Sequence, residues 1–333
     1  MKKYTLKVLP HESLQLVHPQ RFTIDYKNEL NPAQFTAVSS VNGPYLVIAG
    51  AGTGKTRTIV YRVSYLVELG VKPESILLLT FTRKAAQEML RRATILLDSR
   101  CERVAGGTFH SFANTILRKH ARLIGYETNY TILDQTDAED VMNLIRTRLK
   151  FDTKEKRFPR KEALYDLHSR TVNTLIPLPL LVEQDYPQYA EQIEDIRKVH
   201  VTYAQYKQQH SLMDYDDLLV NLVKLLTDHE GVRNMLSDKY KYVMVDEYQD
   251  TNKMQAEIAR LLASRHGNLM VVGDDAQSIY SFRGSTIENI MAFAGEFSGC
   301  TVIKLEENFR STQPILNLAN EILKRSSELS DFH

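Results

Sequence analysis

Residues 45–56 read YLVIAGAGTGKT, an apolar run that enters a glycine-rich turn and ends in lysine and threonine. The run Tyr45–Ala49 predicts a buried strand, and the stretch from Lys55 to about Leu69 contains no helix breaker and predicts a helix. Glycines in such a turn let backbone N–H groups converge on phosphates, and the N-terminus of the helix favours their negative charge. The stretch therefore predicts a phosphate-binding loop at the end of a strand.

The lysine and the threonine give this loop its chemistry. In the P-loop pattern the lysine reaches the β- and γ-phosphates, and the hydroxyl group after it ligates magnesium. We therefore expect Lys55 to be catalytic and Thr56 to hold Mg²⁺. A glycine-rich turn that only links strand to helix is the alternative, but it leaves both side chains unexplained. The residues expected at the nucleotide are Ala49, where the strict pattern has glycine, Gly50, Ala51, Gly52, Thr53, Gly54, Lys55, Thr56 and Arg57.

A second apolar run, Tyr242–Val245, ends in the carboxylates Asp246 and Glu247. Asp246 is placed to hold magnesium, and Glu247 is placed to polarise the attacking water. Such a pair on its own would be interpreted as a solvated acidic turn. Together with the phosphate loop, it predicts a nucleotide hydrolase.

Further out, strands alternate with helices, which favours a parallel α/β sheet. The other strands are predicted at residues 75–80, 104–108, 269–272 and 300–305, and a helix capped by Asn31 is predicted to run to about Ser39. Residues 126–212 have amphipathic helical stretches and few strand signals, so we interpret them as an insertion into the sheet domain. Weak alternation at residues 4–8 and 22–26 predicts a short strand or an extended arm.

The composition is that of an ordinary folded protein, since 43% of the residues are hydrophobic and 25% are charged. The two cysteines, Cys101 and Cys300, lie in no metal-binding pattern. No apolar run approaches the ~18 residues that a membrane helix needs. We therefore expect a cytoplasmic protein without membrane contact. With a formal net charge of +1, any binding to nucleic acid must use a local basic surface.

From about Leu30 to Arg325, the motifs and their order resemble the UvrD/Rep/PcrA group of superfamily 1 DNA helicases. The matching segments are residues 31–34, 80–86, 107–111, 214–219, 246–251, 273–284 and 307–311. The resemblance implies a RecA-like P-loop NTPase sheet domain with an inserted all-helical subdomain. The implied divisions are an N-terminal extension at 1–28, a motor domain at 29–124 and 211–310, the insertion at 125–210, and the start of a second motor domain at 311–333.

The resemblance also implies that the nucleotide is ATP. Gln34 would read the adenine edge, and Phe309, where the family usually has tyrosine, would stack on the base. Gln277 and Arg310 would contact the γ-phosphate and count as catalytic. A guanidinium group suits this role because it stabilises the charge of the transition state. Gln249 could position water or couple the site to a neighbouring domain.

Binding of single-stranded DNA needs aromatic faces beside cations. The residues that the resemblance places on the DNA are Phe81, Thr82, Arg83, Thr108, His110, Tyr280, Phe282 and Arg283, with Phe282 standing where the family commonly has tryptophan. For Phe109, stacking and core packing stay equally open. Residues 83–122 carry nine basic against three acidic side chains, and residues 146–161 carry eight against two. These runs predict salt-sensitive binding, with a solvated helix face as the alternative.

The function implied by the resemblance is an ATP-dependent helicase that moves 3′ to 5′ along single-stranded DNA and acts at junctions with duplex DNA. The motifs of the second motor domain do not follow within the 333 residues. We therefore expect the N-terminal half of such an enzyme, which alone would hydrolyse ATP poorly and would not unwind DNA. The alternatives are a motor subunit of a helicase–nuclease complex and a DNA-binding ATPase that does not unwind. The oligomeric state stays open, as does the choice between repair and replication.

Overall fold

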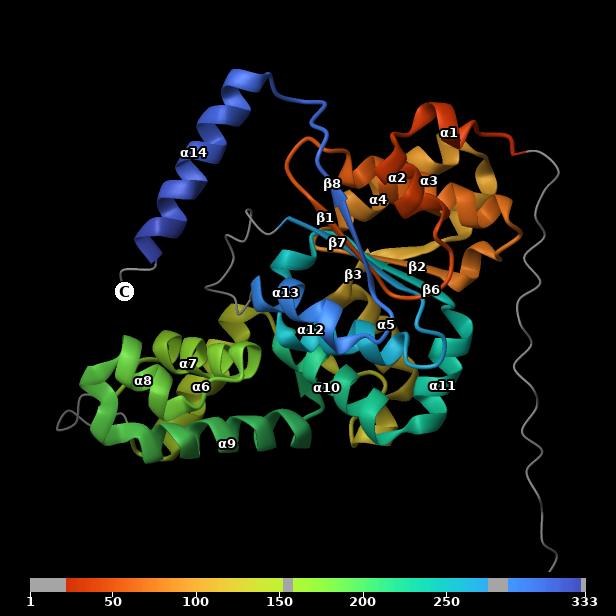
Figure 1. The fold of residues 1–333 in the computed structure, drawn as a ribbon. Coiled ribbons are helices and arrows are strands. Elements are labelled where there is room, and N and C mark those ends of the chain that lie inside the picture. Colours follow the sequence, from red (N-terminus) through yellow and green to blue (C-terminus); the bar gives the residue numbers. More distant parts are fainter. Residues whose placement is uncertain (1–21, 152–157, 275–286, 331–333) are drawn as a thin grey trace, which may run out of the picture.

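The computed structural model describes residues 22–151, 158–274 and 287–330 of the chain. Six parallel strands form a sheet in the order β3-β2-β6-β7-β1-β8, with helices on both sides (Figure 1). The strands are β1 (Tyr45–Ala49), β2 (Ile76–Thr80), β3 (Ala105–Thr108), β6 (Tyr242–Val245), β7 (Leu269–Gly273) and β8 (Thr301–Leu305). The predicted α/β class with a parallel sheet is confirmed.

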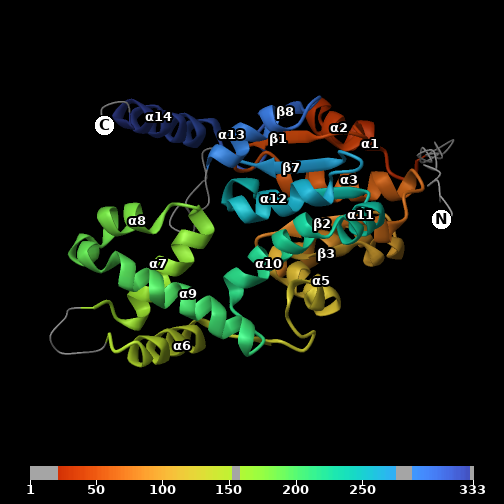
Figure 2. The same cartoon turned by 90° about the horizontal axis from the view of Figure 1, so that it is seen from below.

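Helices cover both faces of the sheet, and alternate residues of a strand point to opposite faces, so each strand contributes side chains to two cores. In β2, Leu77 and Leu79 enter one hydrophobic core, whereas Ile76 and Leu78 enter the other. The first core lies under α5 (Phe109–His120), α10 (Tyr215–Asp228), α11 (Glu230–Lys239), α12 (Lys253–Leu262) and α13 (Ile287–Glu296). The second lies under α2 (Pro32–Ser39), α3 (Lys55–Glu68) and α4 (Arg83–Leu96), as Figures 1 and 2 show.

The parallel pairing brings the carboxyl ends of all six strands to one edge of the sheet. The phosphate loop follows β1, Phe81 follows β2, Asp246 follows β6 and Asp274 follows β7, while Thr108 ends β3. Ligands of open parallel sheets bind at this edge. Segments that are far apart in the sequence are therefore neighbours where the candidate site lies.

The helical middle of the chain has a hydrophobic core of its own, built from residues such as Leu164, Ile196 and Tyr203. Its helices are α6 (Gln135–Arg148), α7 (Lys161–Thr174), α8 (Leu178–Asp185) and α9 (Ile193–Gln209), drawn in green in Figures 1 and 2. A short parallel pair, β4 (Thr131–Ile132) with β5 (Leu212–Met213), joins the segment that leaves the sheet domain to the segment that returns to it.

A cluster of buried charged side chains stabilises the segment where the chain passes from the insertion back to the sheet domain. Lys207 near the end of α9 is 1% exposed, and its Nζ lies 2.6 Å from Asp214 Oδ2 and 2.7 Å from Asp217 Oδ2. Tyr203 donates to the same Asp214 oxygen at 2.8 Å, and Asp214 also caps α10. Burial opposes the ammonium charge, but the two carboxylates outweigh it and raise the pKa of Lys207. The cluster explains why the segment 214–219 is acidic at its start: its carboxylates fix the junction between insertion and sheet domain.

Acid should destabilise the helical insertion. Burial lowers the pKa of His168 to about 3 and that of His200 to about 4, and their rings pack 5.0 Å apart. Since both values lie below that of an unfolded histidine, the unfolded chain binds more protons below pH 6.5, and stability falls as the pH falls through this range. At pH 5 each histidine should cost about 1–2 kcal/mol.

Hydrogen exchange of the α7 and α9 amides, measured from pH 7.5 to pH 5 and corrected for the intrinsic rate, checks this expectation. His168→Phe should weaken the pH dependence because it removes one of the two groups. A protection that stays constant over this range would contradict it.

The two ends of the described chain lie outside the central sheet. Of the two alternatives expected at 22–26, a short strand or an extended arm, the strand is wrong: Asp25 accepts from Asn28 N and starts helix α1 (Tyr26–Glu29), while Phe22 stacks on Tyr65 of α3. Residues 4–8 lie outside the described part. At the other end, α14 (Gln313–Ser330) extends away from the sheet domain (Figure 1). Among the described helices, none has the length and apolar character that crossing a bilayer requires.

Candidate nucleotide and nucleic-acid site

The phosphate loop adopts backbone conformations that need glycine. Gly52 has φ +81° and Gly54 has φ +89°, a region that L side chains rarely adopt. At Gly54 a Cβ atom would also lie 2.6 Å from Gln34 Nε2, and at Gly52 it would lie 2.7 Å from Arg310 Cβ. These two glycines let the loop turn into α3 and let neighbouring segments pack closely on it.

Two carboxylates, one of them unexpected, lie near the lysine of the loop. Lys55 Nζ donates to Ala49 O at 3.2 Å and lies 3.5 Å from Asp274 Oδ2 and 3.9 Å from Glu247 Oε2. The structure therefore brings together the ends of β1, β6 and β7, as predicted for Lys55 and Glu247. Asp274 was not predicted as a site residue. Its signal was present, because it ends an apolar strand as Asp246 does.

Asp246 has the features of a metal ligand. It is 5% exposed, and its Oδ1 has no hydrogen-bond partner among the described residues. Burial, followed by the charge of Glu247, raises the pKa of Asp246 to about 7. Thr56 lines the same cavity of about 520 Å³ as Asp246. An unpartnered buried carboxylate oxygen beside a hydroxyl group fits Mg²⁺, which prefers oxygen ligands.

Glu247 has a strained backbone. Its φ of +51° and ψ of +48° lie in the left-handed region, which costs a residue with a side chain about 1–3 kcal/mol. The nearby Asp250 has a buried Oδ1 that no described group contacts by a hydrogen bond. Burial, followed by the charge of Glu247, raises the pKa of Asp250 to about 6. Residues with such a strained backbone cluster at active sites, where the surrounding structure holds them in place. The strain therefore agrees with a catalytic role for Glu247.

Gln34, Arg57 and Phe309, which are expected at the nucleotide, lie near the phosphate loop, but their contacts are with the chain itself. Gln34 is 2% exposed; it donates to Thr53 O at 3.0 Å and accepts from Asn31 N at 3.3 Å. Arg57 contacts Glu29 O and Tyr61 on the side of α1. Phe309 is 61% exposed, so its ring is accessible to a base. Contact of Gln34 and Phe309 with adenine, and of Arg57 with the nucleotide, stays a prediction.

Asn308, which was missed, holds the segment of Arg310 against the phosphate loop. Asn308 Nδ2 donates to Ala51 O at 2.6 Å, and its Oδ1 accepts from Arg310 N and Ser311 N at 2.9 and 2.8 Å. Phe309 N donates to Gly52 O at 2.9 Å. These bonds place the expected γ-phosphate contact Arg310 beside the loop. The role of Asn308 at the loop was not predicted, because Ala51 lies 257 residues away in the sequence.

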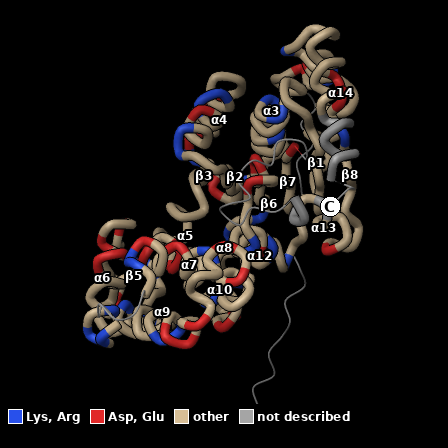
Figure 3. The backbone as a smooth tube through the Cα atoms, turned by 90° about the vertical axis from the view of Figure 1, so that its left-hand side faces the viewer, with Lys and Arg blue, Asp and Glu red and all other residues tan. Residues whose placement is uncertain are grey.

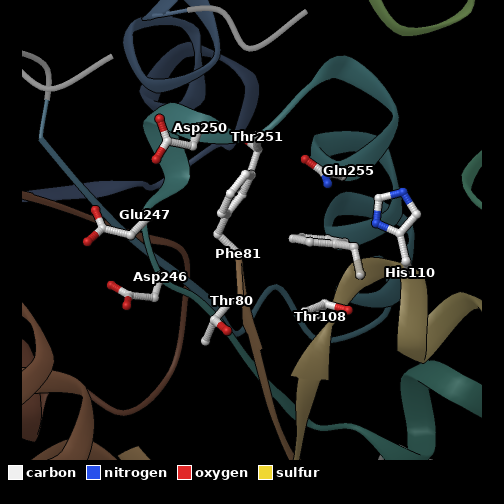
Figure 4. Close-up of a pocket in the computed structure, with 10 residues that line it drawn as sticks. Thr80, Phe81, Thr108, His110, Asp246, Glu247, Asp250, Thr251 and Gln255 are labelled. Atoms are coloured by element: carbon white, nitrogen blue, oxygen red, sulfur yellow. The ribbon is translucent and has the colours of Figure 1, made fainter. Parts of the chain in front are cut away.

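A cavity of about 190 Å³ is lined both by carboxylates and by residues expected at DNA. Figure 4 shows Asp246, Glu247 and Asp250 on one side and Thr108 and His110 on the other, with Phe81 between them. Burial lowers the pKa of His110. Phe81 is 38% exposed, whereas Phe109 is 3% exposed and belongs to the core, which favours core packing for Phe109. The two sets of residues thus share one cavity.

The basic run at 83–122 is partly neutralised by its own acidic residues. Glu88 bonds Arg91 and Arg92, and these bonds lower its pKa to about 2. In contrast, Arg83 and Lys84 are exposed at the start of α4, where Figure 3 shows basic residues along the helix. Thr82 and Thr108 cap α4 and α5 with their hydroxyl groups.

Several predicted residues cannot be placed. Gln277, Tyr280, Phe282 and Arg283 lie outside the described residues, as do residues 152–157 of the second basic run. In the described part of that run, Lys161 bonds Asp140 at 2.6 Å, and Arg148 lies over the ring of Tyr206.

Comparison with known families decides the relationship of the chain. The family model described as the UvrD/REP helicase N-terminal domain matches residues 30–298. The chain belongs to the UvrD/REP helicase family. It is 39% identical over 304 residues to the ATP-dependent DNA helicase PcrA of Staphylococcus aureus and 37% identical over 300 residues to that of Staphylococcus epidermidis.

Each of these alignments covers 90% of this chain and 40% of the relative. The chain thus spans less than half the length of the curated relatives that it matches. Within the UvrD/REP helicase domain, the match includes the phosphate loop, the acidic strand end and the helical insertion.

Proposed function

We propose that this UvrD/REP helicase domain is the nucleotide-hydrolysing part of an ATP-dependent DNA helicase that works in the cytoplasm with Mg²⁺. The observation that carries the proposal is the meeting of Lys55 with Glu247 and Asp274 at the carboxyl edge of the sheet. The names of the similar helicases agree with it. We assign residues 29–124 and 211–310 to the motor domain, 125–210 to its insertion and 1–28 to an N-terminal extension.

The proposed mechanism gives each of these side chains one role. Lys55 binds the β- and γ-phosphates, and Glu247 accepts a proton from water while the water oxygen bonds to the γ-phosphorus. The bond from this phosphorus to the bridging oxygen breaks, and ADP leaves. Arg310, held beside Gly52, offsets the charge that develops on the γ-phosphate. Thr56 and Asp246 would hold Mg²⁺, which neutralises phosphate charge.

The shared cavity supports coupling between hydrolysis and DNA. Phe81 and His110 line it together with Asp246 and Glu247, so a base stacked on Phe81 would adjoin the carboxylates. We propose that single-stranded DNA and its junctions with duplex DNA bind over Phe81, Arg83 and His110. Residues 311–333 would begin a second motor domain, as the exposed Ile315, Leu318 and Ile322 of α14 suggest.

Arg83→Ala tests the DNA surface. Because Arg83 is an exposed cation beside Phe81, its loss should weaken binding to all single-stranded sequences alike. The slope of the logarithm of affinity against the logarithm of salt concentration should fall by about 1. Fluorescence anisotropy with labelled oligothymidylate at several salt concentrations measures both quantities.

Lys72→Ala is the matched control, since this exposed cation precedes β2 at the opposite edge of the sheet. An Arg83 variant with an unchanged slope would place the DNA elsewhere. A strand-displacement assay then separates a helicase from a DNA-binding ATPase that does not unwind. The helicase–nuclease alternative predicts in addition a co-purifying nuclease activity.

A further inference from the structure

Gln249 is a buried side chain with two defined hydrogen bonds at the edge of the site. It is 1% exposed and lies two residues after the strained Glu247. Its Nε2 donates to Glu247 Oε2 at 2.8 Å. Its Oε1 accepts from Asp274 N at 2.9 Å. One amide therefore joins the ends of β6 and β7 at the two carboxylates nearest to Lys55.

The surroundings of Gln249 fix the direction of this amide. A Cβ atom on Gly273 would lie 2.8 Å from Gln249 Oε1, so the last residue of β7 leaves just enough room for the side chain. The backbone N–H of Asp274 is a donor, which requires the oxygen of the amide on its side. The nitrogen must then face Glu247, because Glu247 offers only acceptor oxygens when ionised.

From this geometry we propose that Gln249 is a positioning residue for hydrolysis, which holds the carboxylate of Glu247 in the orientation that accepts a proton from the attacking water. This rests on the proposed function. Glu247 is 36% exposed at its side chain and has a left-handed backbone, so packing alone does not fix its carboxylate. The buried amide of Gln249 donates a hydrogen bond to this carboxylate at 2.8 Å, whereas Lys55 Nζ lies farther from the same oxygen, at 3.9 Å. Gln249 itself touches neither nucleotide nor water in this role.

Gln249→Glu isolates that one bond. The new carboxylate still accepts from Asp274 N, which preserves the link between the strand ends, but it turns an acceptor oxygen toward Glu247 and repels it. Single-turnover hydrolysis of ATP should slow by about tenfold or more, since a positioned general base contributes about 10²–10⁴-fold. The affinity for ADP should stay within about threefold, whereas the affinity for ADP–aluminium fluoride should fall about tenfold, because only the transition-state analogue needs the oriented base.

Gln208→Glu, the same change on the exposed surface of α9, is the control and should leave all three quantities unchanged. Gln249→Met removes both bonds and should slow hydrolysis at least as much, which provides a second variant if Gln249→Glu does not fold. Hydrolysis within twofold of the wild type in either folded variant, or an equal loss of affinity for ADP and for the analogue, overturns the proposal. Wild-type protein that binds no ADP would instead overturn the proposed function, and this inference with it.

Discussion

Lys55→Ala is expected to reduce ATP hydrolysis by about 10²–10³-fold, the usual cost of removing one preorganised donor from developing charge. In the structure the ammonium group lies between the phosphate loop and the carboxylates of Glu247 and Asp274. Its removal takes away the cation that binds the phosphates. It also leaves the two carboxylates without the positive charge that offsets their repulsion of the nucleotide.

Binding of single-stranded DNA should survive this change, because Lys55 does not line the cavity that contains Phe81 and His110. Phosphate release and fluorescence anisotropy on the same preparation measure the two activities separately. Lys239→Ala, at the exposed end of α11, should retain both. Equal loss of hydrolysis and DNA binding in the Lys55 variant would contradict the view that Lys55 lies outside the DNA-binding surface.

Lys207→Met should lower the stability of the junction between insertion and sheet domain by about 3–5 kcal/mol, the usual cost of leaving buried charges without their partner. Asp214 is fully buried, and its Oδ2 accepts from Lys207 and Tyr203 alone among the described side chains. Methionine retains most of the apolar stem of the lysine. The loss therefore reports the charge and not a cavity.

Hydrogen exchange at the amides of α9 and α10 measures this effect locally, where it is expected to be largest. Lys224→Met is the control: its exposed pair with Asp228, at 3.7 Å, should contribute less than about 1 kcal/mol. A change below about 1 kcal/mol for Lys207→Met would mean that the cluster does not hold the junction.

The phosphate loop and the acidic strand end could be predicted because their signals are local. Strand, glycine turn and helix occupy consecutive residues around Lys55, and apolar residues lead directly to Asp246. The parallel sheet followed from the alternation of strands and helices, and it places both ends at one edge. The weak alternation at Phe22–Tyr26 misled, because these aromatic residues pack on Tyr61 and Tyr65 of α3 and not in a sheet.

Other parts of the site depend on which strands are neighbours, and this order is not visible in the sequence. Gln249 bonds Asp274 only because β6 and β7 lie side by side, and Asn308 reaches Ala51 only because β8 pairs with β1. The burial of Phe109 likewise follows from the position of α5 against the sheet. Contacts of this kind can be identified only from the tertiary structure, even for residues that lie in a recognised motif.

The central claim is that Glu247 completes a site that binds Mg·ATP through the phosphate loop. Single-turnover hydrolysis of γ-labelled ATP by wild-type protein and Glu247→Gln, together with the amount of ATP that each binds, tests it most directly. Glutamine keeps the shape of the side chain but accepts no proton, so both proteins should bind ATP and only the wild type should convert it at an appreciable rate. Conversion by Glu247→Gln at the wild-type rate, or failure of the wild type to bind ATP, would contradict the account.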